Sequence, residues 1–216
     1  MSGIGIVEIA AQKKSLHDSQ RDTSRVKHER AAFAEVVEEF LNPDLARLKF
    51  LDESGAHLGL TRLCGRAAPG ERVPEGTPGH SGAHYTVVAA LSLNGISAPW
   101  VFEGAMDAVA FRVYVEHELG PSLEPGDIVI LDNLSAHKDA QARALIEARG
   151  AYLLFLPPYS PDFNPIELCW ATVKKALRAA KARTLDALVE ALRIALLAVT
   201  PDHADAWFSH CGYAAA

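Results

Sequence analysis

A run of four apolar residues, from Ile128 to Leu131, ends abruptly at Asp132. A short, wholly apolar run of this kind is typical of a strand buried on both faces of a sheet, which requires helices on either side. Strand-like segments precede the run, and helical and strand-like segments alternate after it. The pattern therefore predicts an α/β protein with a mixed sheet flanked by helices.

The expected elements follow in a definite order. The strand-like segments before the apolar run are Arg47 to Asp52, about His57 to Cys64, Tyr85 to Leu93, and Pro99 to Glu103. The later elements are helices over Asp107 to Leu119 and Ala140 to Arg149, a strand over Tyr152 to Leu156, and helices over Pro165 to about Ala182 and Leu185 to Val199. Thr184 is the expected N-cap of the last helix. The Gly- and Pro-rich stretch from Gly65 to Gly82 predicts a long loop.

Three separated acids stand at the ends of predicted elements: Asp52, Asp132 and Glu167. In open α/β sheets, ligands bind outside the carboxyl ends of the strands. Hard divalent cations prefer oxygen ligands, which carboxylates supply. The pattern therefore favours metal-dependent phosphoryl-transfer chemistry.

Each acid also has a purely structural explanation. Asp132 can equally well begin a loop or cap a helix, and position alone slightly favours Asp52 as a turn residue at a strand end. Glu53 would point to the opposite face of the strand, so it is expected to support the site or to lie at the surface. Glu167 is the third residue after the potential N-cap Asn164, which is the capping-box position, and on local pattern alone that role is favoured.

Two polar residues follow Asp132 closely: Asn133 and His137. They are expected to contact the metal ligands rather than the metal itself. A histidine at the start of a helix is more often a surface or capping residue. Beside a metal site, His137 could instead contact the scissile phosphate or steer a water molecule.

Five basic residues and no acid lie between Leu168 and Arg183. An ordinary solvated helix face explains such a run in most proteins. Because this run directly follows Glu167, four of its members are candidates for binding DNA: Lys174, Lys175, Arg178 and Lys181.

Composition narrows the class of protein. The formal net charge of −6 argues against a dedicated DNA-binding module. The three cysteines are far apart and form no CxxC pair, which argues against a zinc knuckle or a disulfide framework. No apolar run approaches the roughly 18 residues needed to span a bilayer, and no basic region precedes the apolar N-terminus as in a secretory signal. A cytoplasmic, reduced protein with no membrane partner is expected.

At its acids the chain resembles the DDE transposases of bacterial insertion sequences, specifically the IS630 group related to Tc1/mariner elements. The matching stretches are FLDESGAH, ILDNLSAHK and LPPYSPDFNPIELCW, with smaller likenesses in GRAAPGER and EGAMDAVAFRVYVE. The resemblance runs from about Lys13 to the C-terminus, and the 34 residues between Asp132 and Glu167 are themselves a family trait. It implies an α/β catalytic domain of the RNase H-like fold, with a mixed five-stranded sheet flanked by helices. Asp52, Asp132 and Glu167 would be its catalytic triad.

The resemblance also implies cofactors and partners. Two Mg²⁺ or Mn²⁺ ions per site would serve an attack by water, and then by the freed 3′-hydroxyl, at element ends and at a TA target. The partner would be DNA, with a dimer assembled on it, in the nucleoid of a bacterial cytoplasm.

One departure from the family pattern affects the domain assignment. Members normally carry helix-turn-helix modules ahead of the catalytic domain, whereas only about 45 residues precede the first strand here. Residues 1–45 are therefore expected to be an N-terminal arm or linker, and residues 46–216 the catalytic domain. The end-binding part would be a separate N-terminal transposase part.

The alternative function is an inactive, truncated remnant that binds DNA or the full-length transposase and modulates it. An unrelated α/β phosphatase or nuclease would need another acid cluster, such as a DxD motif, which the sequence lacks.

Overall fold

A computed structural model describes residues 18–79 and 82–214; the first residues of the chain, MSGIGIVEIAAQ, lie outside this range. Five strands form one mixed sheet in the order β3-β2-β1-β4-β5. Their bounds are Leu48–His57 (β1), His84–Ser92 (β2), Gly95–Glu103 (β3), Ile128–Leu131 (β4) and Tyr152–Phe155 (β5). The first three strands are antiparallel neighbours, whereas β4 is parallel to both β1 and β5.

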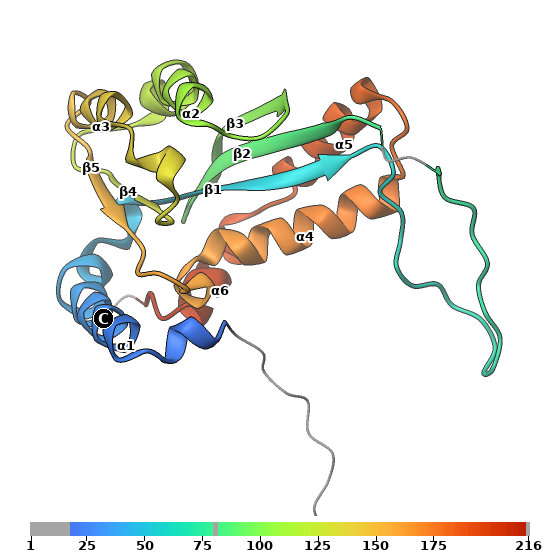
Figure 1. Cartoon of the computed structure of the whole chain (residues 1–216), viewed down its shortest axis with the longest axis horizontal. Coiled ribbons are helices and arrows are strands. Elements are labelled where there is room, and N and C mark those ends of the chain that lie inside the picture. The colour runs from blue at the N-terminus through green and yellow to red at the C-terminus, as the bar shows by residue number, and fades with distance from the viewer. Residues whose placement is uncertain (1–17, 80–81, 215–216) are drawn as a thin grey trace, which may run out of the picture.

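Helices cover both faces of the sheet (Figure 1). Two of them, α2 and α3, lie on one side, and α4 and α6 lie on the other. The helix bounds are Ser24–Val36 (α1), Ala108–Tyr114 (α2), Ala140–Glu147 (α3), Pro165–Ala180 (α4), Leu185–Leu197 (α5) and Pro201–His210 (α6). The predicted fold, a mixed five-stranded sheet between helices, is confirmed.

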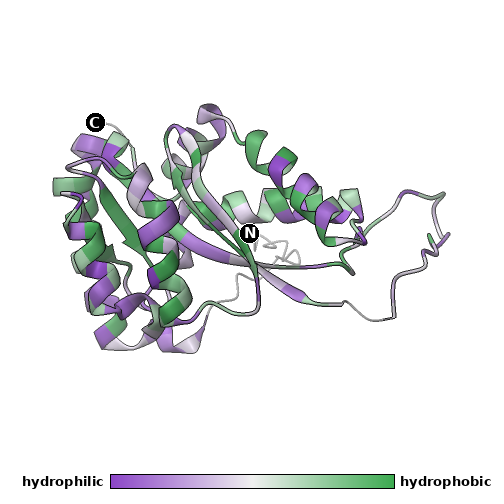
Figure 2. Cartoon of the chain, turned by 90° about the horizontal axis from the view of Figure 1, so that it is seen from above, coloured by the Kyte–Doolittle hydropathy of each residue, from purple (hydrophilic) through white to green (hydrophobic). Residues whose placement is uncertain are grey.

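The alternation of side chains along β1 divides the interior into two cores. Phe50 belongs to the larger core, under α4 to α6, and Leu51 belongs to the smaller core, under α2 and α3. Phe208 and Tyr213 pack their rings edge-on against Phe50, so the C-terminal aromatic residues are part of the larger core. Figure 2 shows apolar strands at the centre and helices of mixed hydropathy around them.

Local sequence signals explain where several helices begin. The Thr184 side chain accepts a hydrogen bond from the amide of Ala187 and so caps α5, as predicted. Thr200 and His203 form a reciprocal capping box at the start of α6, a helix that the sequence pattern did not predict.

The structure corrects the predicted strands at the start of the sheet. The expected strand over His57 to Cys64 is wrong, because β1 continues through Asp52 to His57 and pairs along that length with β2. Residues 58–83 form the connection between these two strands, which extends away from the sheet in Figure 1. Alternating apolar residues alone do not make a strand where no neighbouring strand offers backbone partners.

The segment before β1 packs against the same core as the sheet. Phe33 of α1 is buried there, as are Val37, Leu41 and Leu45 of the turns that follow. The division of the chain at residue 45 stays a prediction. No helix among residues 18–79 and 82–214 has the length and apolar character needed to cross a bilayer.

Candidate active site

The two aspartates are brought together by the pairing of β1 with β4. Phe50 pairs with Ile130, and the same register continued by two residues places Asp52 level with Asp132. Asp132 directly follows β4, as the apolar run predicted. Asp52 lies inside β1 rather than at its end, so its explanation as a strand-end turn residue is wrong.

Glu167, the third acid, lies near the two aspartates but belongs to a helix rather than to the sheet. Glu167 lies in the first turn of α4, after the N-cap residue Asn164. The Asn164 side chain makes no capping hydrogen bond, and no capping box forms at this helix start. Asp52, Asp132 and Glu167 instead line one cavity of about 400 Å³, together with Asn133 and residues 156–161 of the turn before α4.

Negative charge is crowded in this cavity. Burial raises the pKa of Asp52 to about 8, and the charges of Glu167, Glu53 and Asp132 act in the same direction. Desolvation and like charges both penalise an ionised carboxylate, so the cavity favours a cation or a proton beside Asp52.

His137 is buried, with 1 % of its surface exposed, and is not the surface residue that such a position more often holds. Its Nδ1 lies 2.7 Å from Asp132 Oδ1, and its Nε2 lies 2.7 Å from Glu53 Oε1. Burial lowers the pKa of His137, but the two carboxylates outweigh it and raise the pKa to about 10. The ring is therefore an imidazolium that donates to both acids and packs against Phe111. With both nitrogens engaged, it has none left to contact a phosphate.

The sequence left open whether Glu53 supports the site or lies at the surface. In the structure, Glu53 contacts His137, which in turn contacts Asp132. The signal was present in the alternation of β1. Glu53 follows Leu51 on the face toward α2, where His137 packs. Only the folded chain shows that this histidine lies within reach.

The predicted DNA-binding residues lie along α4 beyond Glu167, but they do not share one environment. Lys175 and Arg178 line a cavity of about 360 Å³ with Arg62 of the β1–β2 connection. Lys174 instead lines a separate, small crevice with Ser54 of β1. Lys181, the residue after α4, has a left-handed backbone and pairs with Glu75 of the connection.

No group of three or more histidine, cysteine, aspartate or glutamate side chains, in the part of the chain that the structure describes, is arranged around a single metal position. The three cysteines are free thiols.

Comparison with known proteins places this chain in a family. The family described as DDE superfamily endonuclease matches residues 47–189. Among curated proteins, a sequence search finds no significant match.

The fold is similar to that of Mos1 transposase. A Mos1 transposase paired-end complex with the left transposon end superposes with a TM-score of 0.71 at 16 % identity, over 94 % of this chain and 63 % of that one. A Mos1 mariner paired-end complex with Mn gives 0.69 at 14 % identity, over 95 % and 63 %. The Mos1 mariner catalytic domain alone gives 0.60 at 12 % identity, over 94 % and 91 %. This chain thus spans about 63 % of the longer Mos1 chains, and the predicted RNase H-like fold of a DDE catalytic domain is confirmed.

Proposed function

This chain belongs to the DDE superfamily of endonucleases, and on that premise we propose that it is the catalytic domain of a DNA transposase. It would hydrolyse phosphodiesters at the ends of its element and join the freed strand to target DNA at a TA step. The observation that carries the proposal is the single cavity lined by Asp52, Asp132 and Glu167. Mos1 complexes with transposon ends, which share the fold, support DNA as the partner.

Asp52, Asp132 and Glu167 would hold Mg²⁺ or Mn²⁺, two ions per site. Bound there, such cations supply the charge that activates an attacking oxygen and stabilises a leaving one. The residues fit this group, because they offer only oxygen donors and because burial, together with the neighbouring carboxylates, raises the pKa of Asp52 to about 8. Mg²⁺ commonly takes one or two carboxylates and completes its shell with water and phosphate oxygens.

Asp132 and Glu53, which both contact His137, have distinct tasks in this proposal. The carboxylate of Asp132 is held in one orientation, because His137 and the amide of Leu134 both donate hydrogen bonds to its Oδ1. That leaves Oδ2 outside this contact and available to a cation. Glu53 completes the arrangement by balancing the charge of His137 on its far side.

Lys175 and Arg178 would contact the phosphate backbone of bound DNA, with Arg62 opposite them. They extend from the acidic cavity along α4, so a strand cleaved beside Glu167 could follow the helix. Lys174 and Lys181 stay candidates for the same contact. Lys181 would first have to leave its ion pair with Glu75. On DNA the protein would act as a dimer and together with a separate end-binding part.

The proposal is tested by strand cleavage. Labelled DNA carrying the element ends is incubated with the protein and a helix-turn-helix part that binds those ends, with Mn²⁺ or with EDTA. We expect nicking at the element boundary that needs Mn²⁺ and that Asp132→Asn abolishes. Nicking that continues undiminished in Asp132→Asn would contradict the assignment, and DNA binding without nicking would favour the modulator instead.

A further inference from the structure

The turn that leads into α4 has a conformation that its own sequence does not favour. Tyr159 has a left-handed backbone, with φ of 56°, which is rare for a bulky residue. The N-cap side chain of Asn164 adds no hydrogen bond to the helix start. A strained backbone of this kind persists only where surrounding structure holds it. The turn also forms much of the cavity wall, so whatever holds it shapes the site.

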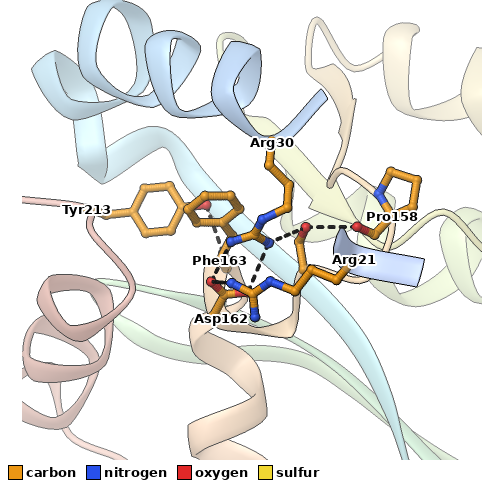
Figure 3. Close-up of polar contacts among 7 residues, drawn as sticks. Arg21, Arg30, Pro158, Asp162, Phe163 and Tyr213 are labelled. Atoms are coloured by element: carbon orange, nitrogen blue, oxygen red, sulfur yellow. Dashed lines mark hydrogen bonds and ion pairs between the residues drawn. The ribbon is translucent and has the colours of Figure 1, made fainter. Parts of the chain in front are cut away.

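Arg30 of α1 makes several contacts with this turn (Figure 3). Its Nη1 donates to Asp162 Oδ1 at 3.0 Å, and its Nη2 donates to Asp162 Oδ2 at 2.7 Å. Nη1 also donates to Ser160 Oγ at 2.6 Å, and that hydroxyl donates to the carbonyl of Pro158 at 3.0 Å. The guanidinium lies 4.5 Å from the centre of the Phe163 ring. One side chain thus contacts three residues of the turn.

Two further residues, from opposite ends of the chain, also contact this turn. Arg21 donates to Asp162 Oδ2 at 2.9 Å, on the same carboxylate that Arg30 holds. The hydroxyl of Tyr213 donates to the carbonyl of Phe163 at 2.8 Å. We call Arg21, Arg30 and Asp162 the arginine clamp. A bidentate arginine–carboxylate pair sets both distance and angle, so it fixes orientation as well as proximity.

We propose that Arg30 is a positioning residue for Glu167, acting through the arginine clamp on the turn that begins α4. Glu167 is five residues from Asp162, and its amide donates to the carbonyl of Asn164 at 3.2 Å. Holding Asp162 therefore holds the first turn of the helix that carries the acid. The segment expected to be an arm before the catalytic domain would then be part of the catalytic unit. This inference rests on the proposed function of the cavity.

A matched set of variants tests the inference. Arg30→Ala removes the clamp, and Arg30→Lys keeps the charge but loses the two parallel hydrogen bonds. Arg25→Ala is the control, because Arg25 is exposed on the same helix and pairs with Glu29 one turn away. For each variant, residue-resolved amide exchange is measured by NMR in metal-free buffer, and Mn²⁺ affinity is measured by calorimetry.

We expect amide exchange from residue 159 to 168 to accelerate about tenfold in Arg30→Ala and less in Arg30→Lys. The Mn²⁺ dissociation constant should rise about tenfold in the same order, as for other groups that orient a metal ligand. Arg25→Ala should change neither quantity. If Arg30→Ala does not fold, Arg30→Lys decides the question.

Two results would overturn the inference. One is faster exchange with unchanged Mn²⁺ affinity, which would make the clamp a purely structural contact. The other is unchanged exchange at Glu167, which would show that the turn holds itself. If the wild type takes up no Mn²⁺, the proposed function fails, while exchange at the Glu167 amide still decides whether Arg30 positions that residue.

Discussion

The first turn of α4 is held by side chains from both ends of the chain, whereas its last turn borders a long, exposed connection. At the first turn, Arg30 and Tyr213 contact the residues just before Glu167. At the last turn, Lys181 pairs with Glu75, and Arg183 donates to backbone carbonyls at the base of the connection. Every residue from Arg62 to Gly79 is exposed.

This difference matches the tasks proposed for the two ends. A carboxylate that ligates a metal must be placed to within fractions of an ångström, and long-range contacts provide that placement. Basic residues that follow a phosphate backbone act through charge, which depends weakly on position. Changes at the first turn should therefore affect catalysis, and changes at the last turn should affect binding.

The largest effect is expected for Glu167→Gln. This substitution takes away a metal ligand without changing the size of the side chain, so strand cleavage should fall at least about 100-fold, beyond what orienting residues give. Gel assays on element-end DNA measure the rate, with Glu190→Gln on the exposed face of α5 as control. Equal loss in both variants would contradict the special role of the first turn.

At the other end, Arg178→Ala should weaken DNA binding and leave the cleavage rate of saturated complexes unchanged. Removing one ionic bond to a phosphate should reduce the slope of log affinity against log salt by about 1. Fluorescence anisotropy over a salt series measures the slope, and Arg193→Ala on α5 is the control. An unchanged slope would mean that this end of α4 does not contact DNA.

The arginine clamp predicts a pH dependence of stability. Burial raises the pKa of Asp162, but Arg30 and Arg21 outweigh it and hold the pKa below its ordinary value of 3.8. The carboxylate therefore stabilises the fold fully above pH 3.8, and this contribution is lost as the pH falls through the lower, folded-state pKa. Urea unfolding of wild type and Asp162→Asn should differ at pH 6 and converge in acid, by an amount that solvent screening keeps near 1 kcal/mol. A constant difference across this range would exclude the ion pair as the cause.

The smallest effect is expected for Lys181→Ala. An exposed ion pair such as Lys181–Glu75 contributes about 0–1 kcal/mol, so the melting temperature should barely change. Limited proteolysis of residues 62–79 should nevertheless become faster. A large drop in melting temperature would show that the connection is held as firmly as the turn before α4.

Much of the sheet could be predicted from the sequence because local pattern determines it, whereas local pattern left each of the three acids with a structural alternative. The apolar run before Asp132 defines a buried strand, and strand pairing brings Asp52 beside it. The full length of β1 could not be predicted, because it depends on its pairing with β2 across a 26-residue connection, from 58 to 83. α6 was missed because its packing, through Phe208 on Phe50, is long-range.

Long-range contacts also limited what could be predicted of the site. For Glu167, local pattern favoured a capping role, and the structure instead places it in the cavity without a capping box. The contact of His137 with Glu53 joins residues 84 positions apart, and that of Arg30 with Asp162 joins residues 132 positions apart. No periodicity or spacing encodes such pairs, since each depends on how the helices pack on the sheet.

Calorimetric titration of Mn²⁺ tests the central claim most directly. Wild type is compared with Asp52→Asn, Asp132→Asn and Glu167→Gln, each first shown to be folded, and with Glu190→Gln as control. If the three acids form one metal site, the wild type and the control bind Mn²⁺, and the heat falls away in each of the three variants. Binding that persists in all three, or no binding by the wild type with or without DNA, would contradict the account.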